Sequence, residues 1–345
     1  MTAMIQRVIA AAAFVALLAG PAPAQRIPTG TGSTRDPAGP PSLSFPLACE
    51  PGKTCEIQHY VDRDPGPGTR DYRCGLKTYD GHPAIDIRLP DMVALRRGVA
   101  VLAAAPGKVV RTRDSVADRQ IGVGTLDPND PLGCGNAVVI DHGGGWTTGY
   151  CHLRRGSVRV KPGDVVSAGQ PIGLVGLSGL TEFPHLHMDV RRNGQAVDPF
   201  APEMSASPSC PAQGPGLWRP AAAARMPYRP GVLLNAGWTS GEPSMDDIEN
   251  GHIKPVGASP PWLIAYFRSI ALMPGDVTEV VLRAPDGTML AQGAREPLSR
   301  WRAQDLHYVG KRRPPAGWPR GVYVAEYRVL RHGVVAVSGR LEMRL

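Results

Sequence analysis

Glycine and proline recur so often along this chain that they argue against long helices. There are 41 glycines and 36 prolines among 345 residues. Both residue types interrupt regular structure, and the runs between them are short and rich in alternating or β-branched residues. The sequence therefore predicts a mostly β fold with antiparallel sheets and tight turns, and its length allows two domains with separate cores.

The strand-like runs form two groups, separated by a stretch rich in proline, alanine and glycine. The first group predicts an antiparallel β-sheet domain. The second predicts a small β-sandwich of six or seven strands, for which an immunoglobulin-like arrangement is one solution. We expect a signal peptide at residues 1–24, a disordered lead-in at 25–44, the first domain at 45–204, a linker at 205–230 and the sandwich at 231–345.

The beginning of the chain predicts export. Arg7 precedes an apolar run from Val8 to Gly20, and Ala22-Pro23-Ala24 then offers a small-residue cleavage site. The apolar run is too short to span a bilayer, and no later run is long and apolar enough to do so. We expect a periplasmic or extracellular protein after cleavage near Ala24, with no transmembrane segment in the mature chain. An uncleaved membrane anchor is the alternative.

Six cysteines agree with an oxidising compartment and suggest disulfides. Cys134 and Cys151 lie on two runs joined by a glycine turn at residues 142–145, which places them nearly opposite each other across a hairpin. No Cys-x-x-Cys pair is present, so a zinc–thiolate site is not expected. Proximity and elimination then predict two further pairs, Cys55–Cys74 and Cys49–Cys210.

The net charge of +8 favours attraction to anionic surfaces such as cell-wall polymers or acidic lipid headgroups. Nucleic acid is the competing explanation. The sequence shows neither a recognition motif nor a basic run interleaved with aromatic residues, so we do not expect a nucleic-acid partner. The sequence leaves the oligomeric state open.

Histidine and aspartate residues recur on several predicted strands. On a strand, His185, His187 and Asp189 share one face, opposite an apolar face formed by the residues between them. His82 and Asp86 likewise share a strand face, and a histidine and a carboxylate so placed can reach one cation. On a third run, His152 is expected to share its face with Tyr150. Each group alone is weak evidence for a site, and together they form a constellation.

Five motifs connect these residues in a single order. The motifs are Gly81-His82-x-x-x-Asp86, Gly135-Asn136-x-Val-x-Ile140-x-His142-Gly143, Tyr150-x-His152-Leu153, Val165-x-x-Gly-Gln170-x-Ile172-Gly173 and Pro184-His185-Leu186-His187. Their order resembles the lysostaphin-type zinc metallopeptidases, peptidase family M23, over roughly residues 78–200.

The resemblance implies that His82, Asp86 and His187 hold one zinc ion per chain, with His152 and His185 as the catalytic histidines that are not ligands. Three such ligands leave a fourth zinc position for water, whose pKa falls to about 7. His152 and His185 titrate near neutrality and can accept its proton, and either can be the general base.

The resemblance therefore implies an exported zinc metalloendopeptidase that cuts peptide bonds in the stems or cross-bridges of peptidoglycan. A protein substrate is an alternative within the same class. A catalytically inactive binding or regulatory protein of the cell envelope is another alternative, and a wall-binding module led by the second domain is a third.

Departures from the family pattern concern the neighbourhood of these residues. Ala84 replaces a usual glycine, and Thr181-Glu182-Phe183 replaces small polar residues, so Glu182 and Phe183 are expected to flank the groove and influence substrate choice. We expect an insertion loop at residues 115–131 near the site and a solvated His59. Asp189 is a candidate for orienting an imidazole ring.

Overall fold

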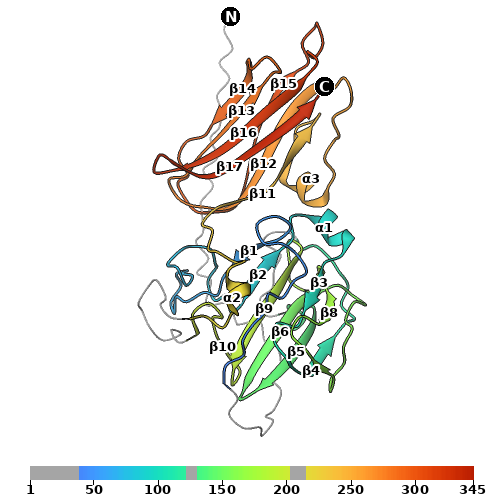
Figure 1. The fold of residues 1–345 in the computed structure, drawn as a ribbon, viewed down its shortest axis with the longest axis vertical. Helices are drawn as coiled ribbons and strands as arrows, with labels where there is room; N and C mark the ends of the chain where they lie inside the picture. The colour runs from blue at the N-terminus through green and yellow to red at the C-terminus, as the bar shows by residue number, and fades with distance from the viewer. Residues whose placement is uncertain (1–38, 122–129, 203–214) are drawn as a thin grey trace, which may run out of the picture.

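The computed structural model describes residues 39–121, 130–202 and 215–345, which form two β-rich domains stacked end to end (Figure 1). The predicted signal peptide, residues 122–129 of the predicted insertion loop and Cys210 lie outside the described residues. Within the described ranges, no helix combines the length and apolarity needed to cross a membrane.

The first domain is built on an eight-stranded antiparallel sheet with the order β1-β2-β9-β6-β5-β4-β7, in which β10 also pairs with β9. A two-stranded sheet of β3 and β8 packs beside it, and a short helix, α1 (Met92–Arg97), follows β2. The strands are β1 (Glu56–His59), β2 (Ile85–Arg88), β3 (Ala100–Leu102), β4 (Gly107–Arg113), β5 (Asn136–Gly143), β6 (Trp146–Leu153), β7 (Val165–Val166), β8 (Pro171–Leu174), β9 (His185–Arg192) and β10 (Gln195–Ala196).

Strand alternation sorts the residues of β2 and β9 as predicted. Ile85 and Ile87 of β2 and Leu186 and Met188 of β9 are at most 1% exposed and belong to one hydrophobic core. In this antiparallel register each apolar residue of β2 faces an apolar residue of β9. The residues between them therefore point to the other face of the sheet, where the predicted site lies.

The segment between the domains differs from the predicted linker in its described part. Leu217, Trp218 and Met226 are buried in the core of the first domain, on either side of α2 (Pro220–Ala223). Leu43, from the predicted lead-in, is also buried there and forms a parallel bridge with Trp218. These side chains pack into the first domain because burying apolar surface removes it from water. Residues 43 and 217–226 are therefore part of that domain and are neither lead-in nor linker.

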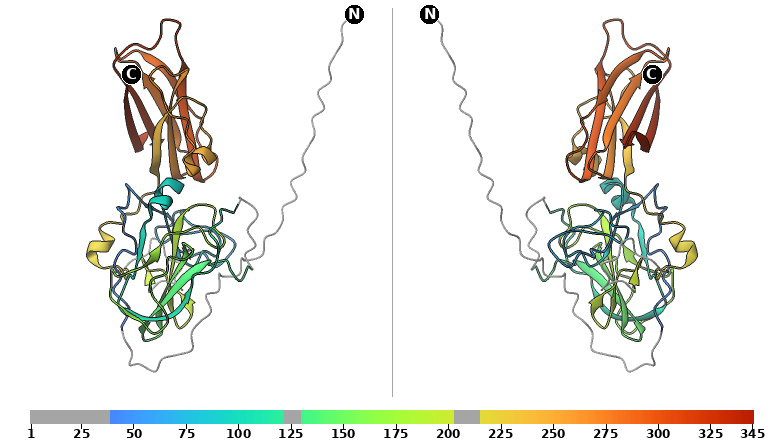
Figure 2. Two further views of the ribbon diagram at one scale, coloured as in Figure 1. Left: turned by 90° about the vertical axis from the view of Figure 1, so that its right-hand side faces the viewer. Right: turned by 90° about the vertical axis from the view of Figure 1, so that its left-hand side faces the viewer.

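The chain crosses between the domains over a very short distance. The Arg229 guanidinium lies 2.8 Å from Glu56 of β1, and the Arg229 carbonyl accepts a hydrogen bond from the buried Lys77 ammonium. The Pro230 carbonyl already accepts a hydrogen bond from Arg331 of the second domain. Arg229 is thus bonded to the first domain and Pro230 to the second. Figure 2 shows the two domains end to end from two further sides.

The disulfides agree with one prediction and correct two. Cys134 and Cys151 are bonded as the hairpin predicted. Cys55 is bonded to Cys49, so the predicted pairs Cys55–Cys74 and Cys49–Cys210 are wrong. The reason is local: a tight turn, in which the Gly52 amide donates to the Cys55 carbonyl, brings two cysteines six residues apart into bonding range.

The second domain is a β-sandwich made of a three-stranded sheet, β11-β12-β15, and a four-stranded sheet, β14-β13-β16-β17. Residues of both sheets share one core, in which the Phe267 and Tyr327 rings stack at 5.0 Å. The predicted β-sandwich is confirmed, and its immunoglobulin-like type stays a prediction. The elements are β11 (Val232–Thr239), α3 (Met245–Asn250), β12 (Trp262–Leu272), β13 (Val277–Arg283), β14 (Met289–Ala294), β15 (Arg302–Arg312), β16 (Val322–Arg331) and β17 (Val334–Arg344).

Candidate metal centre and active site

Two of the predicted ligands, His82 and His187, lie close to one carboxylate oxygen of the third, Asp86. Asp86 of β2 lies opposite His187 of β9 in the sheet register, so their side chains share a face. His187 Nδ1 is 2.9 Å from Asp86 Oδ1, and His82 Nε2, from the loop before β2, is 3.2 Å from the same oxygen. All three residues are at most 3% exposed. The structure thus brings together the three residues that the sequence assigned to zinc.

The donor atoms suit zinc in both spacing and protonation. A tetrahedral zinc ion with bonds of about 2.0–2.1 Å spaces its ligand atoms by about 3.3 Å, close to the separations found here. His82 Nδ1 donates to the Tyr60 carbonyl at 2.8 Å, so its Nε2 carries a lone pair. That Nε2 is buried and has no hydrogen-bond partner among the described residues. A buried nitrogen of this kind calls for a partner, and a cation would supply one.

The other two predicted site histidines stand beside this ligand set. His185 Nδ1 lies 2.9 Å from the Phe183 carbonyl, and His152 Nδ1 lies 2.8 Å from the Ser178 carbonyl. A carbonyl oxygen only accepts hydrogen bonds, so both rings carry their proton on Nδ1 and a lone pair on Nε2. The ring centroids are 4.6 Å apart. Two basic nitrogens are therefore available next to His82, Asp86 and His187.

Burial keeps both rings neutral. It lowers the pKa of His185 to about 4, and it lowers the pKa of His152 well below its usual range, with a further contribution from the neighbouring His185 and His187 rings. Burial alone would raise the pKa of Asp86, but the surrounding histidines outweigh it and hold that pKa well below the usual value. At neutral pH the site therefore holds the Asp86 carboxylate next to the neutral rings of His152 and His185.

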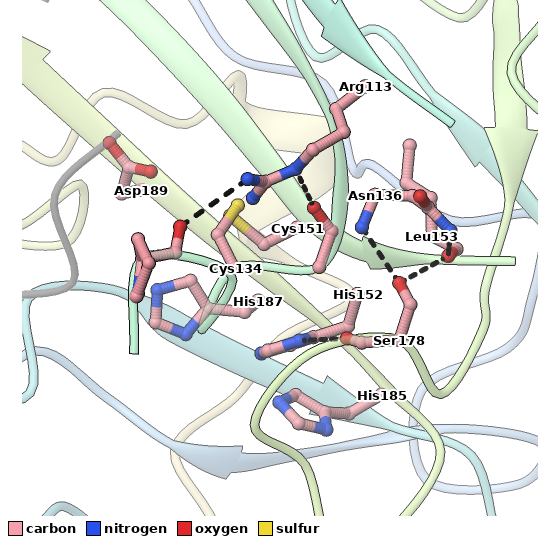
Figure 3. The surroundings of a disulfide bond; sticks show 12 residues. Arg113, Cys134, Asn136, Cys151, His152, Leu153, Ser178, His185, His187 and Asp189 are labelled. Atoms are coloured by element: carbon pink, nitrogen blue, oxygen red, sulfur yellow. Dashed lines mark hydrogen bonds between the residues drawn. A yellow bond between two sulfur atoms is a disulfide. The ribbon is translucent and has the colours of Figure 1, made fainter. Parts of the chain in front are cut away.

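His152 reaches the site through an irregularity in β6. Tyr150 lies opposite Met188 and Cys151 opposite His187, so regular alternation would send His152 to the core side with Tyr150. Instead, the His152 backbone has a φ of 60°, in the left-handed region. This turns the ring toward His185 and His187, as Figure 3 shows. The prediction that Tyr150 and His152 share a face is wrong for this reason.

The Cys134–Cys151 disulfide and its neighbours hold His152 in this conformation (Figure 3). The His152 amide donates to the Cys134 carbonyl at 2.8 Å. Gly135 has a φ of 62°, and a Cβ there would lie 2.1 Å from the Ser178 carbonyl oxygen that accepts from His152. Only glycine allows this approach. The Gly135-Asn136 motif thus positions the loop that orients His152.

His59 belongs to the site, although the sequence analysis placed it in solvent. It ends β1, pairs with Asp86 in the sheet, and its Nδ1 lies 3.0 Å from Asp86 Oδ2. Its side chain is 12% exposed and its ring packs edge-on against Tyr79. The prediction was wrong because β1 lies in a segment that appeared loop-rich. The one sequence signal is the short run Glu56–His59, with Ile57 directed to the core.

Two residues suspected of contributing to the site have other roles. The Tyr150 hydroxyl is fully buried and accepts a hydrogen bond from the Ala104 amide at 2.7 Å. Asp189 accepts a hydrogen bond from Arg191 Nε at 2.7 Å and does not orient an imidazole. Both therefore support the sheet and do not belong to the constellation.

The described part of the predicted insertion loop lies beside the site. Asp118 accepts hydrogen bonds from the Leu177 and Arg155 amides and forms an antiparallel bridge with Ser178. The Ile121 amide donates to the Thr181 carbonyl. Residues 115–121 therefore flank the loop that holds His152 and leads to His185.

The comparisons match the first domain to a family of peptidases. Residues 81–199 match the family model described as Peptidase family M23. This match covers the part of the chain that carries the five motifs and confirms their resemblance to the family.

Curated relatives share this part of the chain. The peptidoglycan DD-endopeptidase ShyA of Vibrio cholerae is 39% identical over 90 residues, which are 26% of this chain and 20% of ShyA. The murein hydrolase activator EnvC of Escherichia coli is 39% identical over 94 residues, 27% of this chain and 22% of EnvC. The chain thus spans about a fifth of the length of these relatives.

Among solved structures, the catalytic domain of the antimicrobial peptidase lysostaphin from Staphylococcus simulans is 25% identical to the aligned part of this chain. The alignment covers 41% of this chain and 85% of the lysostaphin domain, with a TM-score of 0.27.

Proposed function

We propose that this protein is an exported zinc metalloendopeptidase that hydrolyses peptide bonds in the stems or cross-bridges of peptidoglycan. The observation that carries the proposal is that His82 Nε2 and His187 Nδ1 both lie within 3.2 Å of Asp86 Oδ1, on a face that also holds two neutral histidines. Two nitrogens and one carboxylate oxygen are the ligand type of catalytic zinc sites, which keep one position open.

In this proposal, His82, Asp86 and His187 hold the metal. Zinc, when bound, supplies a Lewis acid and a water that is nucleophilic at neutral pH. His152 and His185 present unprotonated Nε2 atoms, one of which accepts a proton during attack and returns it to the leaving amine. Asp86 Oδ1 lies 3.6 Å from His185 Nε2 and would stabilise the imidazolium formed there.

Three observations favour peptidoglycan as the proposed substrate. ShyA, a relative over 90 residues, is named a peptidoglycan DD-endopeptidase. The net charge of +8 favours anionic wall polymers. The disulfides Cys134–Cys151 and Cys49–Cys55 suit an oxidising compartment, in line with export after cleavage near Ala24. We propose residues 45–204 as the peptidase domain, with Leu43 and residues 215–229 packed onto it, and residues 231–345 as an accessory domain.

A regulator without catalytic activity is the second candidate, because EnvC is named a murein hydrolase activator. Against this candidate, the chain retains every residue that the resemblance assigns to zinc and to proton transfer. Loss of a ligand would be expected in a protein that no longer needs the metal.

The test is digestion of purified peptidoglycan, with mass assignment of the fragments and a count of new amino groups. Wild type is compared with His185→Ala and with His142→Ala. His142 is the control because it is a partly buried histidine that is hydrogen-bonded to Pro106 and Thr148, away from the ligands. We expect new amino groups from wild type and His142→Ala but not from His185→Ala.

Metal analysis of the same samples separates the alternatives. One zinc per chain together with peptidoglycan cleavage supports the proposal. One zinc per chain without cleavage of peptidoglycan, but with cleavage of an unfolded protein, would move the substrate to proteins. No zinc and no cleavage would favour the regulator.

A further inference from the structure

Arg88 connects the candidate active site to the second domain. It lies two residues beyond Asp86 on β2, pairs with His185 in the sheet register, and is fully buried. Its guanidinium carbon lies 4.3 Å from the centre of the Phe183 ring, in a cation–π contact. The Phe183 carbonyl is the acceptor for His185 Nδ1–H. Arg88 therefore packs against the residue that orients a proposed catalytic histidine.

The second domain holds this guanidinium in place. Arg88 Nη2 donates to Glu249 Oε2 at 2.8 Å, and Arg268 of β12 donates to the same oxygen at 2.6 Å. Glu249 is 6% exposed, and both arginines are fully buried. Without the carboxylate, two buried guanidinium groups would face each other without a counter-charge, which is strongly unfavourable.

The position of Glu249 is itself well defined. It lies on α3, whose first turn is closed by reciprocal hydrogen bonds between Ser244 and Asp247 and whose end is capped by Gly251 with a φ of 75°. In Figure 1, α3 lies at the junction of the domains, next to α1 of the first domain. A capped helix thus delivers the carboxylate to the boundary.

Further hydrogen bonds hold the two domains together around Glu249. Arg268 also donates to the Pro90 carbonyl, and Asn235 of β11 donates to Asp91, the N-cap of α1. On the other side, Gln58 accepts from Arg88 and donates to the Ala303 carbonyl of β15. The domains therefore meet in a polar interface of defined hydrogen bonds, and Arg88 is the residue of this interface that also contacts Phe183 beside the site.

We propose that Glu249 of the second domain is a positioning residue for the peptidase site. It holds the Arg88 guanidinium against Phe183, and Phe183 in turn keeps His185 in the tautomer and orientation that present Nε2 to the substrate. The catalytic part of this inference rests on the proposed function, whereas the orientation of His185 can be measured without any activity.

The first test compares Glu249→Gln with wild type in the full chain. The control is Glu326→Gln, which removes an exposed carboxylate of the same domain that pairs with Arg340 at 3.0 Å. For Glu249→Gln we expect kcat to fall between about 2-fold and 30-fold, with KM and zinc content unchanged. The control should match wild type. A lower Tm with unchanged kcat would mean that Glu249 only joins the domains, and would overturn the proposal.

The second test uses nuclear magnetic resonance of protein labelled with ¹⁵N-histidine. In Glu249→Gln and in Phe183→Leu, the ring-nitrogen signals of His185 should shift or broaden, while those of His142 stay as in wild type. Phe183→Leu leaves the ion pairs intact and serves if Glu249→Gln does not fold. Unchanged His185 signals in Phe183→Leu would refute the proposal. If wild type proves inactive on every substrate, the proposed function fails while this test of orientation still stands.

Discussion

Replacing His59 by alanine should weaken zinc binding, although His59 is not among the proposed ligands. Its Nδ1 lies 3.0 Å from Asp86 Oδ2, while the other oxygen of the same carboxylate faces His82 and His187. His59 therefore fixes the rotation of Asp86 and leaves Oδ1 directed at the ligand atoms. In His59→Ala, the buried Asp86 Oδ2 loses the hydrogen bond from His59 Nδ1.

Two independent estimates of the effect agree. A hydrogen bond to a charged group contributes about 1.5–3 kcal/mol, which corresponds to roughly 10- to 150-fold in a binding constant. Removing a residue that orients a metal ligand typically costs about 10- to 100-fold in metal affinity. We therefore expect His59→Ala to bind zinc about 10- to 100-fold more weakly than wild type.

The assay is competition for zinc against a chromophoric chelator at neutral pH. His59→Asn is the matched variant, because the asparagine amide lies where Nδ1 was and should restore most of the affinity. His142→Ala controls for loss of a histidine elsewhere. Zinc affinity of His59→Ala within twofold of wild type would refute the reasoning, and so would equal weakening by His142→Ala.

The remaining predictions concern the metal, a disulfide and acid stability. A chelator should abolish peptidase activity, and added zinc should restore it in wild type but not in His187→Ala. Cys134→Ser should lower the unfolding free energy by about 3 kcal/mol in denaturant titrations, because the bond to Cys151 closes a loop of 17 residues. Burial lowers the pKa of His307 to about 4 from 6.5, so the unfolded chain takes up a proton first. The free energy of unfolding should therefore fall as the pH drops from about 6.5 to about 4. His307→Gln should reduce this fall, as measured by denaturation followed by circular dichroism.

Residues on regular strands could be predicted from the sequence. The two-residue period assigned Ile85, Ile87 and Met188 to the core and Asp86 and His187 to the opposite face, and the structure has them so. The period is reliable here because both strands are flanked by neighbours in the sheet and bury one whole face.

Features that depend on irregular backbone or on distant pairing could not be predicted. The positive φ of His152 breaks the period, so that its face could not be read from alternation. His59 lies 27 residues before Asp86, and the register shifts just before it in β1. Glu249 contacts Arg88 across 161 residues, with no local pattern that marks either as a partner.

The direct crossing from Arg229 to Pro230 has a consequence for how the two domains would act on a bound partner. The chain on either side is anchored, by Arg229 to Glu56 in the first domain and by Arg331 to Pro230 in the second. The sandwich is therefore not a module on a flexible tether. Any partner bound to the sandwich would therefore be held at a fixed distance and orientation from the site histidines.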